Sequence, residues 1–183
     1  MPNWCMNTLE LTHSNVEMIE RAKSSFEKGT FLNEFIPMPK ELEGTISPPR
    51  EEDAEVNAIL KARYGWDNWY DWCSANWGVK WDVGQAGNLF SDPEHPNHLI
   101  LHFDSPWAPP LVGIENFRQQ GFRCKLYYWE AGMCFAGISS EDQDLFYNLS
   151  QLNLDEVRST LPPELDRAFG ISNFISTLLE DSV

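Results

Sequence analysis

The chain lacks the short motifs that mark several large enzyme classes. It contains no GxxxxGK[ST] phosphate-binding loop, no HExxH zinc helix and no GxSxG nucleophile turn. Its four cysteines, Cys5, Cys73, Cys124 and Cys134, are scattered and form no CxxC pair. The sequence therefore favours a non-enzymatic protein with no catalytic residues and no cofactor. It also predicts that the cysteines are reduced and buried, where a thiol behaves as a small hydrophobic group.

Long hydrophobic runs are also missing. No stretch approaches the roughly 20 apolar residues that a membrane-spanning helix needs. The first residues, MPNWCMNTLELTHS, have neither the basic start nor the apolar centre of an export signal. We therefore expect a cytoplasmic protein that makes no contact with a membrane.

Positive charge is scarce in this chain. It has 13 Lys and Arg against 28 Asp and Glu, which gives a net charge of −15. Nucleic acid binding depends on basic side chains that neutralise phosphates, so this charge disfavours a nucleic acid partner. Residues 141–183 hold nine acidic and two basic side chains, a net charge of −7, which leaves −8 for residues 1–140. An acidic surface suits a basic protein partner, although solubility alone also accounts for such a composition.

Tryptophan, in contrast, is abundant. Five of the eight tryptophans lie within residues 65–82, GWDNWYDWCSANWGVKWD. At 100° per residue, Trp66, Tyr70, Cys73 and Trp77 fall on one side of a helix. The spacing predicts that most of this group packs against a core, since exposing an indole to water is costly.

Apolar periodicity predicts an α+β fold for residues 1–140. Alternation with a period of two indicates strands at 4–11, 80–90, 97–104, 122–130 and 133–138. Helical spacing and helix-end signals indicate helices that begin after Ser14, Glu51, Asp67 and Pro109. This order predicts a ferredoxin-like antiparallel sheet with the helices on one face.

Residues 141–183 are predicted to form an acidic, mostly helical extension that packs on this domain. The sheet face away from the helices is expected to be too apolar to stay exposed. That face carries Trp4, Met6, Ile100, Tyr127 and Trp129. The extension contains an amphipathic helix that follows breakers at Pro162, Pro163 and Gly170. Its apolar side is Ile171, Phe174, Ile175, Leu178 and Leu179.

Five motifs carry a resemblance to a known family. In chain order they are PNWC-N at 2–7, FIPMPKEL at 35–42, NWGVKWD at 76–82, SPWAPP at 105–110 and YYWEAGMCFAG at 127–137. Together they resemble the YubB-type ferredoxin-like family of plasmid- and phage-associated proteins, over residues 2–140. The resemblance implies the same fold, a bacterial host cell and a mobile-element setting in which counter-defence or host interaction is expected. It implies no activity, because the function of that family is unknown.

Polar and aromatic residues of these motifs are the candidate ligand-binding residues. They are Asn3, Asn7, Asn76, Trp77, Lys80, Trp81, Asp82 and Glu130. A lysine close to a carboxylate, with amides and indoles nearby, suits a small polar ligand. The other interpretation is a buried polar network that joins a helix to a strand. The leading functional hypothesis is protein–protein interaction through an acidic surface, and the alternative is a small-ligand-binding or enzymatic domain that uses residues 76–82.

The sequence also disfavours two further binding functions, of a metal and of RNA. His95, His98 and His102 have a spacing that zinc accepts, but no cysteine or carboxylate completes a familiar ligand set, so no metal is predicted. Aromatic residues on a ferredoxin-like sheet also resemble RNA-recognition domains. The strand LILHF lacks the basic, glycine and aromatic run of those domains, and the overall charge is of the wrong sign.

Overall fold

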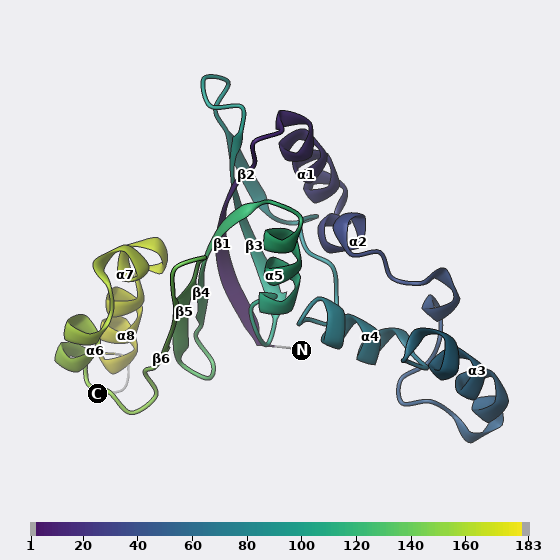
Figure 1. Ribbon diagram of the computed structural model, residues 1–183. Helices are drawn as coiled ribbons and strands as arrows, with labels where there is room; N and C mark the ends of the chain where they lie inside the picture. Colours follow the sequence, from purple (N-terminus) through teal and green to yellow (C-terminus); the bar gives the residue numbers. More distant parts are fainter. Residues whose placement is uncertain (1–2, 181–183) are drawn as a thin grey trace.

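The computed structural model describes residues 3–180, which form a six-stranded antiparallel sheet with helices on both faces (Figure 1). The strand order is β2-β3-β1-β4-β5-β6. The strands are β1 (Trp4–Thr12), β2 (Asn88–Ser91), β3 (His98–Pro106), β4 (Arg123–Glu130), β5 (Phe135–Ser139) and β6 (Asp144–Asn148). Because β1 pairs antiparallel with both β3 and β4, the first four strands have the predicted ferredoxin-like arrangement.

The helices divide into an inner group and a C-terminal group. Along the chain they are α1 (Val16–Lys28), α2 (Phe31–Phe35), α3 (Ala54–Tyr64), α4 (Trp69–Asn76), α5 (Leu111–Gln119), α6 (Leu154–Thr160), α7 (Pro163–Phe169) and α8 (Ile171–Glu180). Short 3-10 turns occur at Lys40–Leu42 and Glu51–Asp53. Within residues 3–180, no helix has the length and apolar character to cross a membrane.

The ends of the helices follow the predicted chemistry with a shift of one residue. The side chain of Asn15, rather than Ser14, accepts the hydrogen bond that begins α1. Asn68, rather than Asp67, does the same for α4. Gly29 ends α1 with a φ of 71°, a conformation that costs glycine little. Neighbouring polar residues compete for the capping position, so spacing alone does not identify which one caps.

The first core lies between the sheet and α1, α2 and α5. Alternate residues of β1 are buried there, and five phenylalanines pack above them. The rings of Phe31 and Phe117 stack with their centroids 4.7 Å apart. Trp72 and Trp77 meet edge to face at 5.5 Å and are both buried, so this part of the tryptophan group packs against the core as predicted.

In the second core, the C-terminal helices pack on the sheet. They cover the opposite face of β4, β5 and β6, where Tyr127 and Trp129 are buried. The residues that cover this face are Leu149, Val157, Leu161, Leu165 and Ile171. The expectation of a mostly helical extension missed β6, which alternates over only five residues. Pro162 and Pro163 separate α6 from α7 as predicted, and Pro163 is also the first residue of α7, where its missing N–H is not needed.

The two helical layers are offset across the sheet. The inner helices lie over β1, β3 and β4, while the C-terminal helices lie over β4, β5 and β6 (Figure 1). The C-terminal helices therefore leave uncovered the part of their face of the sheet that belongs to β1, β2 and β3. We call this part the open half-face: the side of β1, β2 and β3 that bears Trp4, Met6, Phe90, Ile100 and Asp104. Phe90 is 60% exposed there.

The predicted strand at 80–90 is mostly a loop, and only Asn88–Ser91 pairs in the sheet. The side chain of Asp82 turns toward α2 and binds its first backbone N–H groups, which draws the chain across the helical layer. Gly84 then packs so closely on α1 that a Cβ would lie 2.3 Å from the carbonyl oxygen of Phe26. These tertiary contacts override the alternating pattern.

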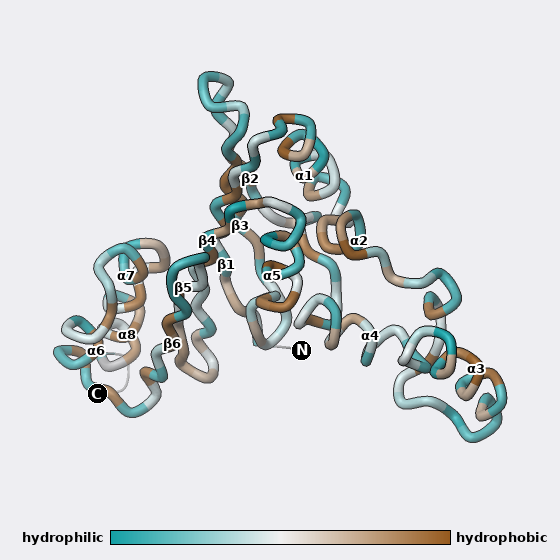
Figure 2. Tube along the Cα trace, viewed as in Figure 1, coloured by the Kyte–Doolittle hydropathy of each residue, from teal (hydrophilic) through white to brown (hydrophobic). Residues whose placement is uncertain are grey.

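Helix α3 begins near the predicted position, and Leu60 is its one buried residue among those that the structure describes. It lies apart from the sheet and remains partly hydrophobic along its length (Figure 2). Val56 and Ile59 are exposed, and Leu60 packs inward. Leu60 and Tyr64, one helical turn apart, are the residues by which α3 packs on the first core.

We expect Ile171→Ala to lower the free energy of unfolding by about 2–5 kcal/mol, because it leaves a cavity in the second core. Ile59→Ala is a matched control, since Ile59 is 66% exposed and its truncation should change stability by less than about 0.5 kcal/mol. Urea denaturation followed by fluorescence measures both. Equal effects of the two substitutions would contradict the packing of the tail.

Candidate functional site

The predicted site residues fall into separate groups, and the first ties β1 to the end of β3. Asn7 is buried and donates from Nδ2 to the carbonyl oxygen of Cys5 (2.7 Å) and to Oγ of Ser105 (2.8 Å). Ser105 donates in turn to the carbonyl oxygen of Ala108 (2.7 Å). This chain of bonds fixes the turn that follows β3, and it leaves Asn7 far from solvent.

The second group holds the turn between β4 and β5. Glu130 is buried, and its carboxylate accepts the backbone N–H groups of Gly132 (2.9 Å) and Met133. The Asn3 side chain lies directly beside this turn, so that a Cβ on Gly132 would come within 2.4 Å of Asn3 Nδ2. The pKa of the nearby Cys5 thiol is raised by burial and further by the Glu130 charge, which keeps the thiol protonated and unreactive.

The third group joins α4 to the helical layer. Asn76 donates to the carbonyl oxygen of Trp72 (2.8 Å), and the indole N–H of Trp77 donates to the carbonyl oxygen of Ile36 (3.0 Å). Both side chains therefore use their polar atoms within the fold. A buried indole generally finds such a partner.

Asp82 connects the loop after α4 to α2. Its carboxylate accepts three backbone N–H groups, from Leu32 (2.7 Å), Asn33 (2.9 Å) and Val83 (2.8 Å). Burial raises the pKa of Asp82, and the three hydrogen bonds oppose that rise. The carboxylate thus takes the place of a capping residue at the N-terminus of α2, where no side chain of the preceding residue does so.

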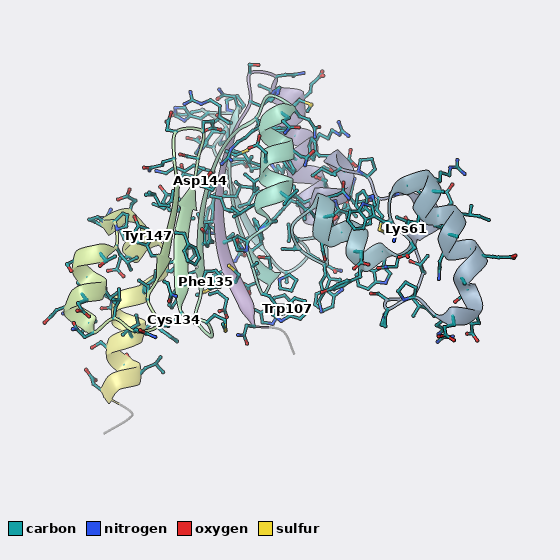
Figure 3. All side chains as sticks on the ribbon, turned by 60° about the horizontal axis from the view of Figure 1, so that its bottom comes forward. Lys61, Trp107, Cys134, Phe135, Asp144 and Tyr147 are labelled. Atoms are coloured by element: carbon teal, nitrogen blue, oxygen red, sulfur yellow. The ribbon has the colours of Figure 1, made fainter. Side chains whose placement is uncertain are left out.

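Lys80 and Trp81 belong to a cluster on the surface. The ammonium Nζ of Lys80 lies 3.7 Å from the ring centroid of Trp81 and 4.0 Å from that of Trp107. The ring centroids of Trp4 and Trp81 are 6.2 Å apart. We call Trp4, Trp81 and Trp107 the indole cluster; they are 47%, 42% and 45% exposed. Figure 3 shows Trp107 at the end of the sheet where β1 begins.

Trp107 holds an unusual backbone conformation within this cluster. Its φ is 65°, which is uncommon for a residue other than glycine, asparagine or aspartate. Its N–H donates to the carbonyl oxygen of Asn3 (2.8 Å), which fixes the turn. The sequence did not single out Trp107 as a binding residue. The SPWAPP motif, an indole between prolines, was the available signal.

A cavity of 320 Å³ opens beside the indole cluster. Trp4, Trp81 and Asp104 line it together with the loop at 82–87. Within residues 3–180, the carboxylate of Asp104 has no hydrogen-bond or ion-pair partner, and burial raises its pKa. Sequence reasoning also missed Asp104, because its position depends on where the loop at 82–87 crosses the sheet.

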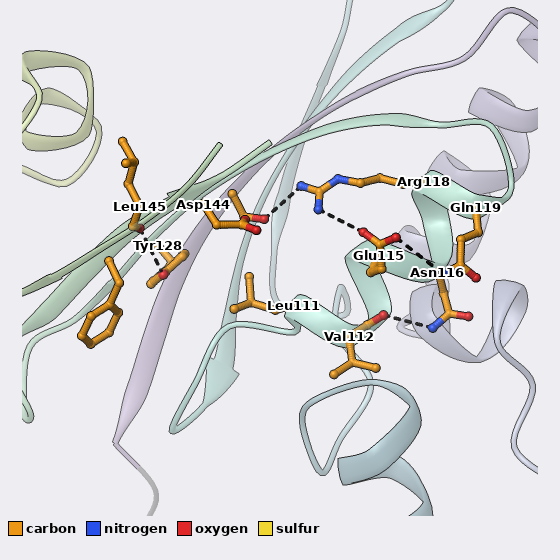
Figure 4. Close-up of a pocket in the computed structure, with 11 residues that line it drawn as sticks. Leu111, Val112, Glu115, Asn116, Arg118, Gln119, Tyr128, Asp144 and Leu145 are labelled. Carbon is orange, nitrogen blue, oxygen red and sulfur yellow. Dashed lines mark hydrogen bonds and ion pairs between the residues drawn. The ribbon is translucent and has the colours of Figure 1, made fainter. Parts of the chain in front are cut away.

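A larger cavity of 640 Å³ lies on the opposite side of the sheet, between α5 and the β5–β6 edge (Figure 4). Its charged floor is Arg118, which donates to Oγ of Ser139 (2.9 Å) and lies 3.4 Å from the Glu115 carboxylate. The walls are mainly apolar, from Leu111, Val112, Leu145 and Phe146. Because Arg118 is already neutralised, this cavity offers a ligand little specific charge.

The histidines do not gather. His95 bonds to Asp92 (2.8 Å) in the loop after β2, and His102 bonds to Thr8 (2.9 Å) on the open half-face. Among the residues that the structure describes, no three or more His, Cys, Asp or Glu side chains are grouped as metal ligands.

No protein-family model and no curated protein sequence matches this chain. Among solved structures, the chain is similar to the crystal structure of protein api92 from Yersinia pseudotuberculosis, a protein of the DUF1281 family. The match has a TM-score of 0.45 and 12% sequence identity, and it covers 81% of this chain and 98% of the other. An overlap of this kind does not indicate which residues bind a ligand or partner.

The carboxylates of Asp82, which is partly buried, and Asp104, which is exposed, give contrasting predictions. Asp82→Asn should lower the free energy of unfolding by about 1–3 kcal/mol, since an amide cannot accept all three backbone N–H groups. Asp104→Asn should change stability by less than about 0.5 kcal/mol, because Asp104 is exposed and has no hydrogen-bond or ion-pair partner within residues 3–180. Chemical denaturation at neutral pH compares the two. An Asp82→Asn variant with an unchanged free energy of unfolding would contradict the capping role.

Proposed function

We propose that the protein is a non-enzymatic accessory protein that binds a basic protein partner through the indole cluster and the open half-face. The observation that carries this proposal is the exposure of three tryptophans together at one end of the sheet. Large exposed aromatic groups are costly in a free protein, and tryptophan is the residue most enriched at the centres of protein interfaces.

The neighbouring surface extends the cluster. Met6, Phe90 and Ile100 continue along the open half-face from Trp4. A second, smaller cavity of 240 Å³ lies where the end of α7 approaches Met6 and His102. Together these residues supply an apolar strip with a few polar groups, which is the usual composition of an interface core.

The net charge indicates the chemistry of the partner. At −15, the chain attracts basic surfaces and repels acidic ones, which speeds the encounter with a basic protein. Asp104 lies inside the strip, and no group of residues 3–180 forms a hydrogen bond or ion pair with it. A cationic side chain on the partner supplies what this carboxylate lacks.

The hydrogen bonds of the predicted site residues favour this role over a small-ligand or enzymatic site at 76–82. Asn7, Asn76, Trp77, Asp82 and Glu130 all use their polar groups to hold the fold together. The strained backbone of Trp107 adds support, because such strain is often retained at functional positions.

The motif resemblance suggests where the partner belongs. The plasmid and phage setting of the YubB-type family supports a host protein as the partner, and counter-defence as the role. A basic host protein also agrees with the acidic surface.

Trp107→Ala should abolish capture of the partner from a bacterial host lysate, because it removes one indole of the proposed interface centre. The unsubstituted protein should retain the same partner at low salt and release it at high salt. Affinity capture with quantitative mass spectrometry measures both effects.

Trp66→Ala is the matched control, since Trp66 is also partly exposed but lies outside the indole cluster. It should capture as much partner as the unsubstituted protein. Circular dichroism checks that each variant is folded. Capture that is insensitive to salt and to Trp107→Ala would overturn the proposal.

A further inference from the structure

We propose that the 320 Å³ cavity beside the indole cluster binds the guanidinium group of an arginine side chain on the protein partner. We call this cavity the cation pocket; Trp4, Trp81 and Asp104 are its defining residues. The inference rests on the proposed function, and it specifies the chemical group that is recognised and the residues that recognise it.

The charge around the cation pocket is negative. Asp82 and Asp104 both line it, and none of its lining residues is basic. The oxygens of Asp82 are occupied by backbone N–H groups, but those of Asp104 have no partner within residues 3–180. A carboxylate in this position is stabilised by an incoming cation that donates hydrogen bonds to it.

The aromatic walls suit a planar cation. Lys80 already places its ammonium group over Trp81 and Trp107, so the chain itself uses cation–π attraction at this cluster. Lys80 does not line the cavity, whereas Trp4 and Trp81 do. The indole surfaces that face the cavity are therefore available to another cation. A guanidinium stacks on an indole and can form two parallel hydrogen bonds to one carboxylate, which an ammonium cannot do.

The size of the cavity favours a single side chain. Its 320 Å³ lies near the lower end of the roughly 300–1,000 Å³ that is typical of ligand sites. The described residues provide no cluster of three metal ligands, so the lining of this cavity suits an organic cation better than a metal ion.

The test uses the full-length protein and two capped tripeptides, Gly-Arg-Gly and Gly-citrulline-Gly. Citrulline has the shape of arginine without its charge. We expect the arginine peptide to shift the indole N–H signals of Trp4 and Trp81 in NMR spectra saturably, while the buried Trp72 and Trp129 signals stay in place. The citrulline peptide should bind about tenfold more weakly or worse.

Asp104→Asn should weaken binding of the arginine peptide by about tenfold, since it replaces the charged acceptor. Asp92→Asn is the control, because Asp92 is exposed in the loop after β2 and does not line the cavity. It should leave binding unchanged. Equal affinity for the two peptides, or an Asp104→Asn variant that binds as well as Asp92→Asn, would overturn the inference.

The outcomes also separate this inference from the proposed function. Trp107 does not line the cation pocket, so Trp107→Ala tests the interface while Asp104→Asn tests the pocket. A partner that is lost with Trp107→Ala but retained with Asp104→Asn would overturn the cation pocket and leave the interface standing. Loss of the partner with both variants, together with arginine binding by the free protein, would support both.

Discussion

The structure depends on the burial of strand β4 on both of its faces. Leu126 and Tyr128 face the first core, while Tyr127 and Trp129 face the second. Burying one indole removes on the order of 200 Å² from water, which contributes about 5 kcal/mol before entropy is counted. Neither helical layer alone can bury both rows, so this single strand requires both. The apolar run LYYW at 126–129 therefore indicates a sheet with a helical layer on each face.

The offset of the two layers follows from that requirement. The helices of the βαββαβ unit reach as far as β4, and the C-terminal helices start there and cover the added strands. Apart from β4, which both layers cover, each layer leaves open the strands that the other covers. The open half-face and the 640 Å³ cavity beside α5 thus both result from the offset of the two layers. The indole cluster lies at the end of the open half-face. Met6 and Trp129 are neighbours across paired strands, yet only Trp129 is fully covered.

Local signals in the sequence predicted the elements that are fixed locally. The alternation in β1 and the spacing in α1 reflect burial on one side, and the structure has both. The loop at 78–87 was not predictable from its own pattern, because the bonds of Asp82 to α2 decide its path. The same limit applies to the site. Asn7 and Glu130 were identified from motifs, but their hydrogen bonds across the chain assign them to the framework. Trp107 and Asp104 lie near the predicted Trp81 only because the loop after α4 folds back toward the end of β3, and tertiary contacts determine that path.

Hydrogen bonding, more than burial or charge, separates framework from surface function in this protein. Asp82 and Asp104 line the same cavity, and burial raises the pKa of each. Asp82 recovers the cost of its burial within the chain, through three N–H groups that also begin a helix. The carboxylate of Asp104 has no hydrogen-bond partner within residues 3–180, and it is exposed. A cation that binds there exchanges the water on this carboxylate for charge-assisted hydrogen bonds. The indoles beside it are also available to a partner, since their exposed area contributes nothing to folding until another surface covers it. The carboxylate and the indoles lie together at one end of the sheet, which favours that end as the binding surface.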